Sequence, residues 1–471
     1  MTAPRVAASP GELISFLDGI AHIDGERLVV DDEGAFRAAG IRDVAWSATF
    51  SEDEATIGAA RWIVWEASQG LGCPSASIHD LYMARSRDEY SGFTVPAINL
   101  RTQVFDMAAA GCRAAMELGA GSVIWELARS EQAYTYQRPG EYITSVLAGC
   151  ISAGWQGPVF VQGDHYQFNA KNYAADPEKV TDALKDATLD AMSAGYGNID
   201  IDSSTLVDLS FESLDEQQKV NYTRAAEVAA LIRENEELVV SIGGEIGEVG
   251  KANSSPEELR AYLDGFNKEF SARAGGNAIG LSKVSVQTGT SHGGVPTADG
   301  SVAEVKLEFE VLKELGVVAR EYGLAGAVQH GASTLPDELF HHFREVETAE
   351  IHLATGFQNA LYEHPAFPAE LYASVEKYCY DNLQDERSEG QTDAQFVYKS
   401  RKKALGQHKR QLWDLETKDQ IIADQKAKMK FLFEQLGIQG NKDIVDRFVA
   451  APERHQPLPG SLKVQSTPTA G

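Results

Sequence analysis

The stretch "VFVQGDHYQFN", residues 159 to 169, places an acid and an imidazole, Asp164 and His165, directly after a short apolar run. Two further histidines, His292 in "TGTSHGG" and His330 in "QHGAST", also follow apolar runs and stand in glycine-rich turns. Neutral imidazoles are good ligands for divalent transition metals, and three of them with one position left open are typical of a catalytic zinc site. The pattern therefore predicts that these three histidines bind Zn²⁺ or another divalent metal.

Carboxylates accompany these histidines. Asp202 and Glu245 close two other apolar runs, and each could orient a histidine, bind the metal directly, or simply cap a helix. We expect Asp164 not to share the metal with His165, because neighbouring side chains of a strand point to opposite faces. Asp164 could turn toward the substrate as an acid/base if the strand has already ended there; capping of the following turn is the structural alternative.

The alternation of apolar runs and helical stretches along the chain indicates which elements position these residues. Across residues 93–356, eight short apolar runs alternate with helical stretches. Eight β/α units over roughly 260 residues are typical of a closed parallel barrel, so the predicted fold class is α/β, a TIM (β/α)8 barrel. An open doubly wound sheet is the alternative, but it would usually bring a glycine-rich phosphate-binding turn after the first strand, and "PAINLRTQ" has none.

A barrel of this kind gathers the polar ends of its strands. Its active site lies at the carboxyl ends, so the residues that close the apolar runs become candidates. They are Asn99, Glu126, Asp164, His165, Asp202, Glu245, His292, His330, His352 and Thr355.

The remaining sequence predicts four segments. We expect a helical N-terminal extension over 1–90, the catalytic barrel over 91–360, a long helical C-terminal arm over 361–450, and a disordered tail over 451–471, which contains Pro, Ser and Thr. Within the arm, "DLETKDQIIADQKAKMKFLFEQLGI" has an apolar stripe suited to packing on the barrel or on a partner subunit. A homo-oligomer is therefore expected.

Composition excludes several classes of partner. The formal net charge is −27 over 471 residues, which disfavours nucleic acids and anionic membranes, because both would be repelled. No apolar run reaches the length of a membrane span, and the N-terminus does not read as a secretory signal. Four widely separated cysteines favour free buried thiols. We expect a cytoplasmic protein that acts on a small molecule.

The glycine-rich turns also favour an anionic ligand, because their backbone N–H groups and hydroxyls suit a phosphate. Arg101 and Arg129 could add positive charge, although exposed arginines are the ordinary interpretation. No lysine closes an apolar run, and Lys283 stands at the start of one. A Schiff-base mechanism is therefore less attractive than a metal-dependent one.

At residues 91–360 the chain resembles the class II, zinc-dependent fructose-bisphosphate and tagatose-bisphosphate aldolases, as a divergent member with N- and C-terminal extensions. The resemblance rests on "TVPAIN", "GDH", "IDSS", "EIG", "GTSHGG" and "HGAST", which occur in this order. It implies that His165, His292 and His330 hold the zinc. It also implies that Asp164 handles the proton of the C4 hydroxyl during cleavage.

Further roles follow from the same resemblance. It makes Asp202 and Glu245 alternative metal ligands or residues that orient the ligands. Asn99 would lie near the substrate. The residues implied in phosphate binding are Gly293, Gly331 and Ser333.

The sequence departs from the family at two places. Strand 8 usually ends in Asn-x-Asp-Thr, which helps to hold the substrate, whereas this chain has His352, Ala354 and Thr355. The loop after strand 5 usually has further acids that move protons at the enolate carbon, and here it offers Glu248, or Glu257 and Glu258 farther on. We assign this second acid/base role to Glu248, and substrate binding to Thr355.

The predicted function is a zinc-dependent aldolase of carbohydrate metabolism, glycolysis included, which cleaves or forms a ketose phosphate or bisphosphate. Two alternatives remain open. A metal-dependent ketose or uronate C4 epimerase could use the same residues through cleavage and recombination. The other alternative is a non-catalytic aldolase subunit, although a subunit without activity should have lost its metal-binding residues.

Overall fold

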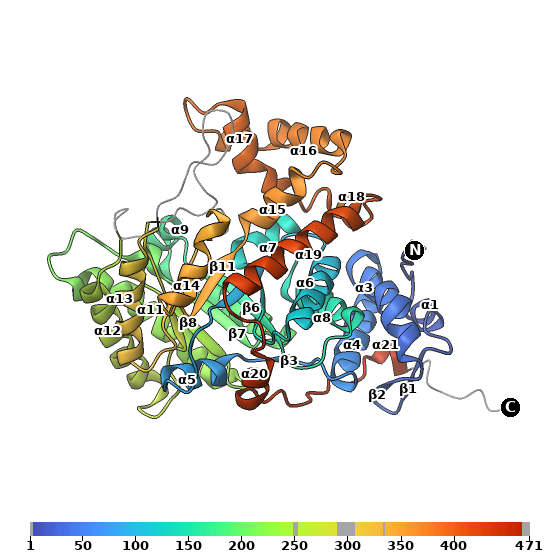
Figure 1. Cartoon of the computed structure of the whole chain (residues 1–471), viewed down its shortest axis with the longest axis horizontal. Coiled ribbons are helices and arrows are strands. Elements are labelled where there is room, and N and C mark those ends of the chain that lie inside the picture. The colour runs from blue at the N-terminus through green and yellow to red at the C-terminus, as the bar shows by residue number, and fades with distance from the viewer. Residues whose placement is uncertain (1–2, 248–252, 290–306, 333–334, 464–471) are drawn as a thin grey trace.

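A closed barrel of eight parallel strands forms the centre of the computed structural model, which describes residues 3–247, 253–289, 307–332 and 335–463 (Figure 1). Each strand pairs with the next along the chain, and the last pairs with the first, which closes the ring. The predicted TIM barrel is therefore confirmed. Its strands are β4 (Val95–Asn99), β5 (Ile124–Ala128), β6 (Val159–Gln167), β7 (Asn198–Asp202), β8 (Ser241–Glu245), β9 (Lys283–Val286), β10 (Ala327–Gln329) and β11 (Glu350–Leu353).

Local sequence signals set the ends of the surrounding helices. Asp176 caps the start of α10 by accepting a hydrogen bond from the backbone N–H of Lys179. Gly119 and Gly195 end α6 and α10 in the left-handed region, where a side chain would be strained. The helices of the ring are α6 (Val104–Leu118), α7 (Arg129–Thr135), α8 (Pro139–Ala153), α9 (Ala170–Ala175), α10 (Pro177–Ala194), α11 (Leu214–Asn235), α12 (Pro256–Ala274), α13 (Phe309–Glu321) and α14 (His341–Glu345).

The N-terminal extension packs along one side and beneath the barrel. Its helices α3 and α4 contact α8, and β3 pairs with the first residues of β6. From α5, Tyr82 donates a hydrogen bond to Glu350 of β11. The extension thus reaches the barrel interior from below. Its elements are α1 (Pro10–Ser15), β1 (Ala21–Asp24), β2 (Arg27–Val30), α2 (Glu33–Ala35), η1 (Phe36–Gly40), α3 (Ile41–Phe50), α4 (Glu54–Gly70), β3 (Ser75–Ala76) and α5 (His79–Ser86).

The C-terminal arm leaves the barrel and then returns to it. Helices α16 and α17 stand away from the barrel at the top of Figure 1, whereas α19 packs against α6. The apolar stripe of α19 is buried through Met429, Leu432 and Phe433 in the core of the barrel and through Ile421 in a smaller core of the arm, so it is not free for a partner subunit. The arm comprises α15 (Thr355–Tyr362), α16 (Ala369–Asn382), α17 (Asp393–Ser400), η6 (Arg401–Ala404), α18 (Lys409–Trp413), α19 (Lys418–Gln435) and α20 (Lys442–Phe448).

Residues 451–463 differ from the expected disordered tail. They run along α4, where the Trp62 indole donates to the backbone oxygen of Gln456 at 3.1 Å. The short helix α21 (Gly460–Lys463) contacts α4 as well, and its Leu462 is fully buried. Composition could not reveal this order, because the partners are side chains of the N-terminal extension. Among the described residues, no helix is long and apolar enough to cross a membrane.

The extensions and the barrel share one hydrophobic core. It runs without a break from α1 through the barrel to α19, α20 and α21. A smaller core lies between α15, α16, η6 and α18. The segment 1–90 and the returning helices α19 and α20 therefore share the core of the barrel, whereas α16 and α17 pack in smaller clusters.

Two glycines offer a matched test of helix packing. At Gly149 in α8, an added Cβ would lie 2.5 Å from the backbone oxygen of Phe105, so α6 and α8 must separate. We expect Gly149→Ala to lower the free energy of unfolding by about 1–3 kcal/mol. Gly58 is exposed in α4 with nothing within 4 Å of such a Cβ, so Gly58→Ala should raise it by up to about 1 kcal/mol. Urea unfolding measures both, and an unchanged stability of Gly149→Ala would contradict the close crossing.

Candidate active site

A bulge in β6 brings Asp164 and His165 into the same cavity. The pairing of β6 with β7 runs regularly to Gly163, shifts, and resumes at Tyr166. His165 takes a left-handed backbone conformation with φ +43°, which breaks the strand's alternation. Both side chains therefore line one cavity at the strand ends. The expectation that they point to opposite faces is wrong for this pair.

The cavity has a volume of about 480 Å³, and it is lined by Asp164, His165, Glu245 and His330 among others. Asp164 Oδ1 lies 3.8 Å from His165 Nε2 and 3.7 Å from His330 Nε2. On the other side of its ring, His165 Nδ1 lies 3.1 Å from Asp202 Oδ2 and 3.3 Å from Glu245 Oε2. The centres of the His165 and His330 imidazole rings are 4.3 Å apart. Five predicted site residues thus meet in two overlapping groups around His165.

The electrostatics of these groups favour a cation. Burial lowers the pKa of His165, but the carboxylates of Asp164 and Glu245 outweigh it and raise that pKa well above its usual value. Burial raises the pKa of Asp202, but its hydrogen bond from His165 lowers it below the usual range. Imidazole and carboxylate donors in this number suit a divalent metal. The described residues therefore fit the metal that the sequence predicts, while His292 lies outside them.

Three predicted substrate-binding residues also line the cavity: Asn99, Gly331 and Thr355. Asn99 Nδ2 donates to Glu131 Oε2 at 2.7 Å, and Gly331 has a φ of +71°. Of the acids named for the loop after β8, Glu257 is exposed, and Glu258 closes the capping box of α12 by accepting from the backbone N–H of Ser255. The predicted residues Glu248, Gly293 and Ser333 lie outside the described residues.

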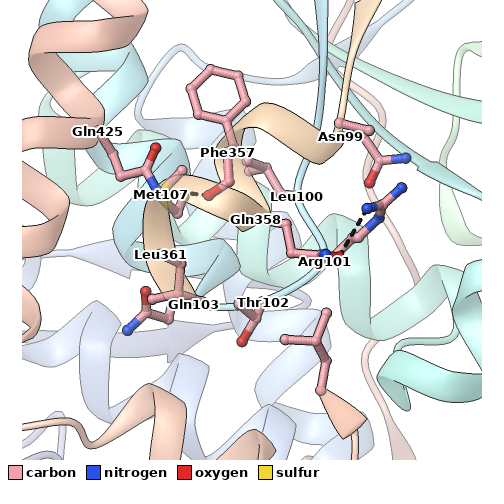
Figure 2. A pocket seen from close by; sticks show the side chains of 12 residues that line it. Asn99, Leu100, Arg101, Thr102, Gln103, Met107, Phe357, Gln358, Leu361 and Gln425 are labelled. Carbon is pink, nitrogen blue, oxygen red and sulfur yellow. Dashed lines mark hydrogen bonds between the residues drawn. The ribbon is translucent and has the colours of Figure 1, made fainter. Parts of the chain in front are cut away.

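Arg101 differs from the ordinary interpretation of an exposed arginine. Its guanidinium is buried against Glu131, with 2.7 Å between Nη2 and Oε1, and it also donates to Gln358 of α15 at 2.9 Å (Figure 2). Lys402 of η6 lines the same cavity. The C-terminal arm therefore contributes directly to the site. Arg129 instead donates to the backbone oxygen of Ala183.

Sequence reasoning named Glu126 and His352 as polar strand ends, but it missed the charged layer beneath them, which consists of Asp200, Lys283 and Glu350. His352 Nδ1 lies 3.0 Å from Glu126 Oε2 and 3.3 Å from Asp164 Oδ1, while its Nε2 lies 2.7 Å from Glu350 Oε1. Lys283 is fully buried and pairs with the same Glu350. Burial, with the nearby Asp164, raises the pKa of Glu126 to about 7. The polar residues at alternate positions of β9 were the available signal that Lys283 faces inward.

With this geometry in hand, the chain can be compared with known proteins. The family model "Fructose-bisphosphate aldolase class-II" matches residues 86–418. No curated protein is similar enough in sequence to count as a match.

Two solved structures with TM-scores above 0.5 agree with this chain in fold at low sequence identity. The fructuronate-tagaturonate epimerase UxaE from Cohnella laeviribosi is 11% identical with a TM-score of 0.54, covering 80% of this chain and 86% of its own. A probable tagatose 6 phosphate kinase from Sinorhizobium meliloti 1021 is 14% identical with a TM-score of 0.52, covering 79% and 98%. The fructose-bisphosphate aldolase of Campylobacter jejuni is 18% identical with a TM-score of 0.45, covering 78% and 96%.

The family match extends over well more than half of the chain and takes in all eight strands of the barrel. The family is metal-dependent, and the cavity offers groups that could hold a metal. The chain belongs to the class II fructose-bisphosphate aldolase family.

Proposed function

We propose that this protein is a zinc-dependent aldolase that cleaves or forms a carbon–carbon bond of a phosphorylated ketose. The observation that carries the proposal is the left-handed bulge at His165. It sets the Asp164 carboxylate 3.8 Å and 3.7 Å from two imidazoles, so a proton acceptor stands beside the proposed metal ligands. An aldolase needs this combination, because the hydroxyl that loses its proton is close to the carbonyl that must be polarised.

The proposed ligands are His165, His292 and His330, with Asp202 and Glu245 as alternative ligands or as residues that orient the histidines. A divalent cation supplies Lewis-acid polarisation of the ketose carbonyl and positive charge close to the developing enediolate. Asp202 and Glu245 both approach Nδ1 of His165, so they fix the orientation of its ring and leave Nε2 toward the cavity. Zinc is the expected metal because imidazoles dominate the donor set.

Asp164 is the proposed acid/base. In cleavage it takes the proton of the C4 hydroxyl as the C3–C4 bond breaks, which leaves an aldehyde and an enediolate. In condensation it returns that proton to the new C4 oxygen. Glu248 is the proposed residue that protonates the enediolate carbon. Asn99 and Thr355 would position the sugar, and the proposed phosphate-binding residues are Gly293, Gly331 and Ser333.

A C4 epimerase is the second candidate, and the end of β11 favours it. His352 replaces the family's asparagine, and both His352 and Glu126 line the cavity together with Asp164. Inversion at C4 requires the aldehyde to rotate before recombination, so that its opposite face meets the enediolate. After this rotation the aldehyde oxygen would need a proton from a group other than Asp164. Glu126 and His352 offer such a group, since 3.0 Å separates them and 3.3 Å separates His352 from Asp164.

Replacement of the proposed acid/base should separate proton transfer from metal binding. We expect Asp164→Ala to lower kcat by at least about 100-fold, because the C4 hydroxyl loses its acceptor. The metal content should stay at the wild-type level, since the proposed ligands are untouched. Turnover with a ketose phosphate and elemental analysis of the purified variant measure the two effects. Full activity in Asp164→Ala would contradict the mechanism.

Removal of the metal gives the complementary result. Prolonged chelation should abolish turnover, and added Zn²⁺ should restore it. His330→Ala should lose both metal and activity, because one imidazole of the cluster is gone. His22→Ala is the matched control, since this histidine is exposed on β1. Activity that persists in the chelated, metal-free protein would rule out a metal-dependent reaction.

Product analysis distinguishes the two candidates. An aldolase should release a triose from its ketose substrate, and a coupled assay detects it as it forms. An epimerase should convert the ketose into its C4 epimer with no free triose, which chromatography of the sugars would reveal. Formation of the epimer alone would refute the aldolase proposal and leave the roles of Asp164 and the histidines in place.

A further inference from the structure

A group of metal-ligating side chains lies on α14, in the ring of helices around the barrel (Figure 1). Among the described residues, five groups of three histidines or carboxylates bring one donor atom each within 4.8 Å of the others. Four of these groups belong to the cavity and to the charged layer below it. The fifth consists of His341, His342 and Glu345, and the proposed reaction does not use it.

Glu345 lies beside both imidazoles of this group. His342 Nδ1 is 2.8 Å from Glu345 Oε2, and His341 Nε2 is 3.9 Å from Glu345 Oε1. In a tetrahedral site with metal–ligand bonds of about 2.0–2.1 Å, the donor atoms lie about 3.3 Å apart. The two measured separations lie on either side of this value. Small rotations of the side chains would therefore let all three bind one ion.

The approach of the two imidazoles is not expected for adjacent residues of a helix. Successive side chains point about 100° apart around the helix axis, so neighbours in sequence normally face different directions. Here the ring centres of His341 and His342 are 3.9 Å apart, because both rings turn toward Glu345. The ring of Phe309 packs beside His342, with 5.1 Å between the centres. The two histidines and the carboxylate thus already form one group.

The donor types and their exposure indicate which ion would bind and how firmly. Two imidazoles and one carboxylate suit Zn²⁺, whereas Mg²⁺ and Ca²⁺ prefer sites made of oxygen donors. Three protein ligands leave one tetrahedral position for water. The side chains of His341, His342 and Glu345 are 35%, 39% and 54% exposed, so an ion can reach them from solvent and exchange with it.

We propose that His341, His342 and Glu345 bind a divalent transition-metal ion, with Zn²⁺ as the expected one, at a site separate from the cavity. The first and last residues of α14 are both ligands, and this helix of five residues has no side-chain hydrogen bond at its N-cap. A helix this short is marginal by itself, so an ion that joins its two ends stabilises it. Because α14 connects β10 to β11, the ion also stabilises a connection between two strands of the barrel.

Zinc binding to the full-length protein tests the site directly. The protein is dialysed to equilibrium at micromolar free Zn²⁺, and the bound zinc is counted by elemental analysis. We expect His342→Ala to bind one zinc fewer per chain than the wild type. Glu345→Gln keeps the length of the side chain and should weaken this site at least about 10-fold, since even residues that only orient a ligand contribute that much. Further dialysis against metal-free buffer should remove the exposed ion and leave the zinc of the buried cavity in place.

Hydrogen exchange locates the bound ion on the chain. At a free Zn²⁺ concentration about ten times the dissociation constant, the amides of α14 should exchange about 10-fold more slowly in the wild type, because the ion binds only the closed helix. Exchange in His342→Ala should not respond to Zn²⁺.

The matched control is His22→Ala, which should bind as much zinc as the wild type. His22 also pairs with a carboxylate, 2.7 Å from Asp31, but it belongs to no group of three such donors in the described part of the chain. Equal zinc contents of wild type and His342→Ala, or displacement of the exposed ion by Mg²⁺, would overturn the proposal. Neither result would affect the metal proposed for the cavity, because His330→Ala and turnover test that metal.

Discussion

One buried cation constrains the interior of the barrel. The ammonium of Lys283 on β9 is fully buried and contacts Gln162 of β6 at 2.8 Å, Asp200 of β7 at 3.0 Å, and Glu350 of β11. Removing one partner from such a buried pair typically costs about 3–5 kcal/mol, because the other charge is left uncompensated. A slip of any of these strands by one residue would turn its partner away from the ammonium. Charge pairing, together with apolar packing, therefore fixes the registers that align the strand ends above.

The same charge layer extends upward into the cavity that Asp164 and His165 line. Glu350 contacts both Lys283 and His352, and His352 contacts Asp164 at 3.3 Å. The proposed acid/base thus has a fixed imidazole below it and two further imidazoles beside it. Burial raises the pKa of Asp200 to about 6 even though Lys283 acts to lower it, so negative charge is unfavourable in this layer unless it is paired. So many carboxylates can lie close together in the barrel only because positively charged groups, either side chains such as Lys283 or a bound metal, balance their charge.

The sequence was sufficient to predict the barrel, because each of its eight strands is a short apolar run with a polar end. It was not sufficient to predict the bulge at His165, since a left-handed histidine has no pattern of its own. The best clue was Gly163, where an added Cβ would meet the Tyr166 ring at 2.3 Å. The inward position of Lys283 was missed because its place at the start of a strand suggested the wrong end of the barrel. The order of residues 451–463 depends on partners such as Trp62, which lies 394 residues from its acceptor Gln456.

The most divergent parts of the chain converge on the site from opposite directions. Tyr82, from the N-terminal extension, binds Glu350 below the cavity, and Lys402, from the C-terminal arm, lines the cavity itself. At the end of β11, Ala354 lines the cavity that Lys402 also lines. Residues of both extensions therefore lie next to the histidines and carboxylates that the barrel strands place around His165. Recognition can then diverge in the extensions while the bond-breaking chemistry stays in the barrel, since the two depend on different residues.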